Sequence, residues 1–170
     1  MRKVSCVSDL HLFCIRSNAE SHMDEIEKAI AESDIFIFNG DSIDFRWSRF
    51  SSVEETIRES IHWLKRLVKN APHCQFHYIL GNHDCNDQFV RALDALSTEY
   101  PNLEWHNYYV KLGTSLFLHG DVANRRMDAQ GLKTYRAGWS QEEQRGEFQN
   151  SLHNIVFKLG IHKLVARYRF

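Results

Sequence analysis

Four short apolar runs in this chain each end in a group of Asp, Asn or His residues. Runs of this kind, rich in β-branched and aromatic side chains and bounded by turn residues, are typical of strands. The groups that follow them are Asp9-Leu10-His11, Gly40-Asp41-Ser42-Ile43-Asp44, Gly81-Asn82-His83-Asp84 and His119-Gly120-Asp121. Because ligands of open α/β sheets bind outside the carboxyl ends of the strands, the four groups predict one polar site at one edge of a sheet.

Strands and helices alternate over the first hundred residues. The expected strands are 4–7, 35–38 and 75–80, and the second has no polar alternation, as expected for a strand covered on both faces. Capping-box patterns at Ser17-x-x-Glu20 and Ser52-x-x-Glu55 predict the starts of two helices, and a third is expected over about 87–97. This alternation predicts βαβ units and a sheet that begins parallel.

The pattern changes after residue 100. Two β-rich runs, 104–112 and 114–118, meet at Gly113 and predict a hairpin or a tight connection. From Asp121 onward the sequence is polar and helical in character. We therefore expect an α/β fold (α+β layered), with a core over residues 1–121 and a helical, cap-like segment of the same domain over 122–170.

The composition excludes several classes of protein. The 170 residues are 43% hydrophobic and 25% charged, which fits one globular domain. The formal net charge of −1 gives no electrostatic reason to expect nucleic acid as a partner. No apolar run approaches the ~20 residues of a membrane span. The four cysteines have no paired spacing, which predicts a reduced, cytoplasmic setting.

The last twenty residues, 151–170, mix large apolar side chains with Lys and Arg. Such a mixture is typical of helices that lie on a membrane surface, so the segment is a candidate for peripheral contact with the inner face of a membrane. The alternative, which we prefer, is an ordinary amphipathic helix packed on the sheet.

The side chains at the strand ends suit a metal centre. Asp9 and His11 point the same way on an extended segment, and Asp41 offers two oxygens that can bridge two metals. Asn82 adds an amide oxygen and His119 an imidazole. Each group alone also fits a turn or a buried histidine, but four in succession are improbable as turns alone. This ligand mixture favours Mn²⁺, Fe or Zn²⁺, and two such metals ~3.5–4 Å apart can bind a phosphoryl oxygen and a nucleophilic hydroxide.

The four groups together resemble the successive signatures of the calcineurin-like metallophosphoesterase superfamily, over residues 4 to about 121. The resemblance implies a β-sandwich flanked by helices and a binuclear metal centre. Ser8-Asp9-Leu10-His11-Leu12 and the His-Gly-Asp form of the fourth group look most like the branch that contains UDP-2,3-diacylglucosamine pyrophosphohydrolase. That branch typically has Arg at the position of His83, so its substrate does not carry over.

The resemblance also implies roles for single residues. Two divalent metals are implied, with Mn²⁺ as the first candidate and Fe or Zn²⁺ as alternatives. One metal would take Asp9, His11 and Asp41, and the other would take Asp41, Asn82 and His119. His83 would act as general acid or charge stabiliser, with Asp44 as the carboxylate that orients it and Asp84 as the less favoured choice. Arg46 and Arg125 are the arginines that we expect to reach an anionic substrate.

One signature of the superfamily has no counterpart here. The family closes its site with Gly-His-x-His, whereas His153 and His162 are nine residues apart and lack the Gly. We expect the chain to be a fragment of a longer enzyme; completion by another chain and a degenerate site are the alternatives.

The function that we expect is metal-dependent hydrolysis of a phosphate ester or pyrophosphate bond by a metal-bridging hydroxide. The substrate would be a phosphorylated small molecule or a lipid-linked nucleotide such as UDP-2,3-diacylglucosamine. The alternative is a non-catalytic or weakened binding scaffold with the same fold. The sequence does not predict the oligomeric state.

Overall fold

A four-stranded parallel sheet forms the centre of the fold in the computed structural model, which describes residues 2–123, 128–140 and 155. The strands lie in the order β1 (Val4–Val7), β2 (Ile35–Asn39), β3 (Gln75–Ile79) and β4 (Leu103–His106). Ile35 pairs with both Val4 and Gln75, which sets the register of the first three strands. The predicted α/β class and the parallel start of the sheet are confirmed.

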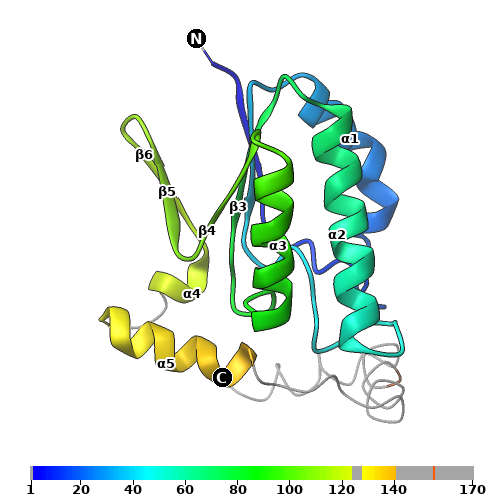
Figure 1. Ribbon diagram of the computed structural model, residues 1–170, viewed down its shortest axis with the longest axis vertical. Helices are drawn as coiled ribbons and strands as arrows, with labels where there is room; N and C mark the ends of the chain where they lie inside the picture. Colours follow the sequence, from blue (N-terminus) through cyan, green and yellow to red (C-terminus); the bar gives the residue numbers. More distant parts are fainter. Residues whose placement is uncertain (1, 124–127, 141–154, 156–170) are drawn as a thin grey trace, which may run out of the picture.

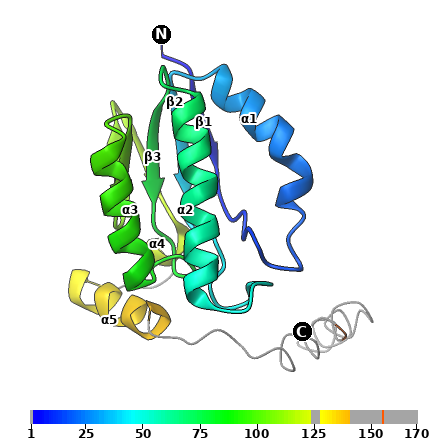
Figure 2. The same cartoon turned by 45° about the vertical axis from the view of Figure 1, so that its right-hand side comes forward.

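The helices between these strands all lie on one face of the sheet (Figures 1 and 2). They are the 3₁₀ turn η1 (Ala19–His22) with α1 (Met23–Ala31), then α2 (Val53–Asn70) and α3 (Asp87–Glu99). Each strand pairs with the next one along the chain, and the crossovers between parallel strands share one hand. All the connecting helices therefore lie on the same face of the sheet. The main core therefore lies between sheet and helices, where Phe36, Phe76 and Tyr78 are almost fully buried.

Only one of the two predicted serine caps is formed at a helix start, and there the Glu55 carboxylate accepts from the amide and hydroxyl of Ser51. The Ser52 hydroxyl accepts a hydrogen bond of 3.1 Å from the Glu55 amide and caps α2 as expected. The prediction at Ser17 was wrong. Its hydroxyl accepts from the amide of Ala19 and donates to the Leu10 carbonyl, so it fixes the preceding loop, and η1 begins after Asn18 without a side-chain cap.

The other face of the sheet carries an antiparallel hairpin, β5 (Tyr109–Leu112) and β6 (Ser115–Leu118). The hairpin turns at Gly113, whose φ of 60° confirms the predicted connection. The single run predicted over 104–112 was wrong, because it contains two strands in two sheets. The chain leaves the parallel sheet after His106, and the carbonyl of Asn107 accepts a hydrogen bond from Arg136.

Two further helices follow the hairpin, α4 (Gly120–Ala123) and α5 (Ala129–Ser140). Within the residues that the structure describes, no helix is both long and apolar enough to cross a membrane. The segment expected to contact a membrane, 151–170, lies outside the described residues except for Ile155. The division at residue 121 stays a prediction.

Candidate metal centre

The loops after β1 and β2 run side by side at the carboxyl edge of the sheet. Backbone amides of Asp9 and His11 donate to the carbonyls of Gly40 and Asp41, at 3.1 and 2.9 Å. Asp9, His11 and Asp41 have φ values of 56°, 45° and 50°. Side chains other than glycine rarely adopt this left-handed conformation, which costs of order 1–3 kcal/mol each and is typical of functional sites. The backbone is thus bent where the polar side chains gather.

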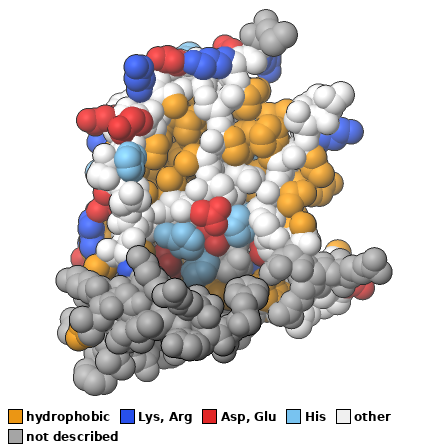
Figure 3. All heavy atoms as spheres, turned by 180° about the vertical axis from the view of Figure 1, so that it is seen from behind, with side chains coloured by type: hydrophobic (Ala, Val, Ile, Leu, Met, Phe, Trp, Pro, Cys, Tyr) orange, Lys and Arg blue, Asp and Glu red, His pale blue; other side chains and the backbone are white. Residues whose placement is uncertain are grey.

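Two imidazoles turn the same nitrogen toward the carboxylates of Asp9 and Asp41. His119 Nε2 lies 3.4 Å from Asp9 Oδ1 and 3.5 Å from Asp41 Oδ2. His11 Nε2 lies 3.9 Å from Asp41 Oδ2. Histidine and acidic side chains are seen together at this end of the sheet in Figure 3.

A second carboxylate supports each of these imidazoles from behind. His119 Nδ1 is 3.1 Å from Asp121 Oδ1, and His11 Nδ1 is 3.2 Å from Asp44 Oδ2. In metal sites the histidine ligands usually donate their second N–H to a carboxylate or carbonyl, which fixes the ring and the tautomer. The two rings therefore have the orientation of metal ligands.

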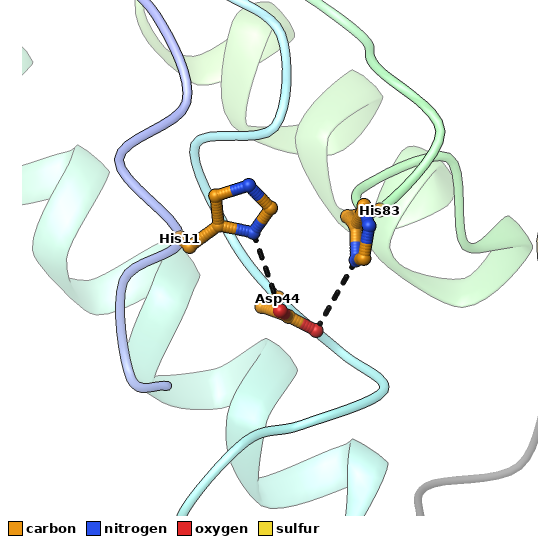
Figure 4. Close-up of side chains that lie close together, drawn as sticks. All are labelled: His11, Asp44 and His83. Atoms are coloured by element: carbon orange, nitrogen blue, oxygen red, sulfur yellow. Dashed lines mark hydrogen bonds and ion pairs between the residues drawn. The ribbon is translucent and has the colours of Figure 1, made fainter. Parts of the chain in front are cut away.

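Asp44 contacts a third imidazole, that of His83 (Figure 4). His83 Nδ1 lies 3.4 Å from Asp44 Oδ1, while the other Asp44 oxygen faces His11. The carboxylate of Asp84 is used elsewhere, since it accepts from the amides of Gly81 and Ser42 and from the Tyr78 hydroxyl. Asp44 is thus the carboxylate beside His83, and Asp84 braces the loop.

The loop after β3 approaches Asp41 closely on both sides of Asn82. The His83 amide donates a hydrogen bond of 2.8 Å to Asp41 Oδ1. A Cβ atom at Gly81 would lie 2.1 Å from the same oxygen, so only glycine fits. These contacts place the backbone of Asn82 beside Asp41.

Comparison with known proteins places the chain in a family. The sequence model described as calcineurin-like phosphoesterase matches residues 2–162. The chain belongs to the calcineurin-like phosphoesterase family. The superfamily resemblance seen in the sequence is therefore confirmed, whereas the branch within it is not shown.

Other comparisons are more distant. One crystal structure that the chain resembles is 18% identical with a TM-score of 0.38, and the match covers 66% of this chain and 49% of that one. The chain thus spans about half the length of that solved relative. A search of curated proteins found no match.

Calcineurin-like phosphoesterases typically use divalent metals, and the donor atoms here fit them. Ligand atoms of Asp9, His11 and Asp41 lie within 4.8 Å of one another. Carboxylate and imidazole donors suit Mn²⁺, Fe or Zn²⁺. The buried Asp41 carboxylate has one oxygen toward both imidazoles and the other hydrogen-bonded to His83, so its position is fixed before any metal binds.

The charges in the centre are strongly coupled. Burial alone would lower the pKa of His119, but the hydrogen bond to Asp121 and the charge of Asp41 raise that pKa to about 9. Burial would raise the pKa of Asp44, but its contacts with His11 and His83 hold that pKa well below the usual range. In the metal-free protein, protons on the imidazoles therefore balance the carboxylates, and metal binding would displace them.

A cavity of about 570 Å³ opens beside the centre. One side of it is formed by Asp9, His11, Asp44 and His83. The remaining lining residues come from the loop after β1, from η1 and from the loop after β2: Leu10, Cys14, Arg16, Ser17, Asn18, Ala19, His22 and Trp47. The guanidinium of Arg16 lies 4.8 Å over the Trp47 ring. The cavity can thus hold an organic group next to the candidate metal ligands.

Of the two arginines predicted to bind substrate, the structure describes Arg46 but not Arg125. The Arg46 guanidinium lies over the rings of Trp47 and Trp139, at 5.7 and 5.3 Å. Arg125 lies outside the described residues.

Two residues of α5 were missed by the sequence reasoning. Arg136 binds Asp121 behind His119, and the Trp139 ring lies 4.8 Å from the ring of His83. Their spacing of three residues puts them on one helix face, but nothing in the sequence shows that this face meets the site.

Proposed function

We propose that this chain is a metal-dependent phosphoesterase that hydrolyses a phosphate ester or a pyrophosphate bond. One observation carries the proposal. Two imidazoles direct Nε2 at the carboxylates of Asp9 and Asp41, while separate carboxylates hold Nδ1 of each ring. A cluster that served only to stabilise the fold would not require two imidazoles oriented in this way around the carboxylates of Asp9 and Asp41.

We assign the ligand sets as the family resemblance implies. Asp9, His11 and Asp41 would hold one metal, and Asp41, Asn82 and His119 would hold the other. Mn²⁺ is the first candidate, with Fe or Zn²⁺ as alternatives. When bound, a pair of divalent metals supplies Lewis-acid polarisation of a phosphoryl oxygen and a strong nucleophile at neutral pH.

His83 is positioned to deliver a proton to the leaving oxygen. It lines the cavity, and its Nδ1 faces Asp44, which leaves Nε2 as the donor atom. Asp44 stays ionised, because its contacts with His11 and His83 hold its pKa far below neutrality, and its carboxylate orients the His83 ring. An imidazole held in this way at the edge of the cavity is suited to general acid catalysis.

The proposed substrate is a phosphorylated small molecule or a lipid-linked nucleotide such as UDP-2,3-diacylglucosamine. The cavity supports a substrate with a sizeable organic group, since it extends from the acids to Trp47 and His22. Arg46 and Arg125 are proposed to bind its anionic part. The lipid branch typically has Arg at the position of His83, so UDP-2,3-diacylglucosamine stands here as an example of the chemical class and not as the substrate itself.

Release of p-nitrophenol from model phosphate monoesters and diesters tests the proposal. We expect turnover with Mn²⁺ and none with EDTA. Asp41→Asn should lower the rate by about two orders of magnitude or more, because both metals would lose a ligand. The matched control is Asp24→Asn, which changes an exposed carboxylate on α1 and should leave the rate unchanged.

Two results would overturn the proposal. One is the absence of metal-dependent turnover in the folded chain, which would favour the binding scaffold. The other is an Asp41→Asn variant as active as the unmodified protein.

A further inference from the structure

We propose that His77, Glu104 and His106 form a second divalent-metal site, separate from the candidate phosphoesterase centre and selective for metals of the Zn²⁺ type. The three residues come from the neighbouring strands β3 and β4. They share no residue with the centre described above, and the inference does not depend on the proposed function.

The strand register brings the three side chains to one face. His77 pairs with Glu104, and His106 follows Glu104 by two positions on the same strand. The residues that alternate with them, Tyr78 and Trp105 among others, pack into the core on the helix side. Because successive side chains of a strand point to opposite faces, the cluster lies on the face that the helices do not cover.

The distances within the cluster match a metal site. His77 Nδ1 lies 3.0 Å from His106 Nε2 and 3.7 Å from Glu104 Oε2, and His106 Nε2 lies 4.0 Å from the same oxygen. A point equidistant from three atoms so spaced lies about 2.1 Å from each, and Zn–N and Zn–O bonds are ~2.0–2.2 Å long. A single ion therefore reaches all three atoms with little movement of the side chains.

An ordinary hydrogen bond explains only part of this arrangement. The contact between the two rings requires one nitrogen to donate and the other to accept. It does not account for Glu104, whose carboxylate converges on the same point but lies too far from either ring for a hydrogen bond. The other oxygen of Glu104, Oε1, accepts a hydrogen bond of 3.4 Å from the side-chain amide Nε2 of Gln75, which helps to orient the carboxylate.

The protonation of the rings also favours a metal. Burial lowers the pKa of His77, with a further contribution from His106, and burial lowers the pKa of His106 too. Both rings are therefore neutral near pH 7 and have lone pairs to offer. Two imidazoles and one carboxylate suit Zn²⁺, Ni²⁺ or Cu²⁺ better than Mg²⁺ or Ca²⁺. Three protein ligands leave a position for water, because Glu104 lies on the exposed side.

Zn²⁺ itself is the probe for the test. Equilibrium dialysis of the whole chain would count bound Zn²⁺, and ¹⁵N spectra of the histidine rings would report which rings bind. We expect Zn²⁺ to shift the ring signals of His77 and His106. Glu104→Gln and His106→Gln should each weaken this site at least about tenfold, so that the chain binds one Zn²⁺ fewer. Glu104 is exposed, so its variant should fold normally.

The matched control is His62→Gln, which removes an exposed imidazole from α2. It should bind as much Zn²⁺ as the unmodified chain. Asp41→Asn separates the two sites, because it should remove Zn²⁺ from the first centre and leave the shifts of His77 and His106 unchanged. The proposal fails if Zn²⁺ does not shift these two rings, or if Glu104→Gln and His106→Gln bind Zn²⁺ as the control does.

Discussion

Asp121 and Arg136 form a buried, two-pronged ion pair that ties α5 to the candidate metal centre. Arg136 Nε lies 2.7 Å from Asp121 Oδ2, and Nη2 lies 2.9 Å from Oδ1. The same Oδ1 accepts from His119, and Arg136 also donates to the carbonyls of Leu80 and Asn107. One guanidinium thus joins the ends of β3 and β4 to the carboxylate that orients His119, a candidate metal ligand.

Arg136→Met should destabilise the fold strongly. It leaves the Asp121 carboxylate buried without its partner, and breaking a buried pair in this way costs about 3–5 kcal/mol. Urea denaturation would measure the free energy of unfolding. The control Arg58→Met removes an exposed arginine from α2 and should cost less than about 1 kcal/mol.

A companion variant separates charge from packing. Asp121→Asn combined with Arg136→Met removes both charges and should recover part of the lost stability. A loss below about 1 kcal/mol for Arg136→Met alone would contradict the buried-pair interpretation.

The strand ends could be predicted from the sequence, whereas the contact between Arg136 and Asp121 could not. The strand ends at Val7, Asn39 and Ile79 were predictable to within one residue, because each apolar run is followed at once by turn residues and polar side chains. The clustering of Asp9 and Asp41 followed from the parallel sheet. Arg136 stands fifteen residues beyond Asp121, and no local pattern marks a buried partner at that distance.

The end of β4 could not be predicted from the local sequence either. Residues 104–112 keep a β-rich composition throughout, so the pattern did not show that His106 ends one sheet and Tyr109 begins another. Between the two strands, the carbonyl of Asn107 accepts a hydrogen bond from Arg136, a residue far along the chain.

Gly81→Ala should disrupt the centre, because a Cβ at this position lies 2.1 Å from Asp41 Oδ1 and 2.6 Å from the Asp41 amide. Either Asp41 or the loop that carries Asn82 has to move. We expect Mn²⁺ affinity, measured by calorimetry, to fall at least about tenfold. Gly138→Ala is the control, since a Cβ there meets nothing within 4 Å on α5. Equal Mn²⁺ affinity in the two variants would argue against Asp41 as a ligand.

Asp44→Asn should change the titration of His11 before any catalysis is measured. Burial lowers the pKa of His11, but the hydrogen bond and the charge of Asp44 outweigh it and raise that pKa above the ordinary value. Removing the charge should therefore lower the pKa, which NMR titration of the metal-free protein would show. The proposed phosphoesterase turnover should also fall, by about 10²–10⁴, as His83 loses its partner. A pKa of His11 that stays in place would contradict the contact.

Protonation of His77 should make the fold less stable in weak acid. Burial and His106 depress the pKa of His77 in the folded chain, and Glu104 opposes them only partly. Below the unfolded value of about 6.5 the unfolded chain takes up a proton that the folded chain does not, so stability falls as pH drops. For a single group the loss is limited to about 1.4 kcal/mol per pH unit.

His77→Gln should remove this part of the pH dependence. Urea denaturation at pH 7.5 and 5.5, with EDTA present, would give the loss of stability for each protein. We expect the loss to be smaller in His77→Gln than in the unmodified chain, while the control His62→Gln loses as much as the unmodified chain. Equal losses in all three proteins would mean that His77 is not held neutral by its surroundings. In that case protons would compete with Zn²⁺ for this ring at a higher pH than the geometry implies.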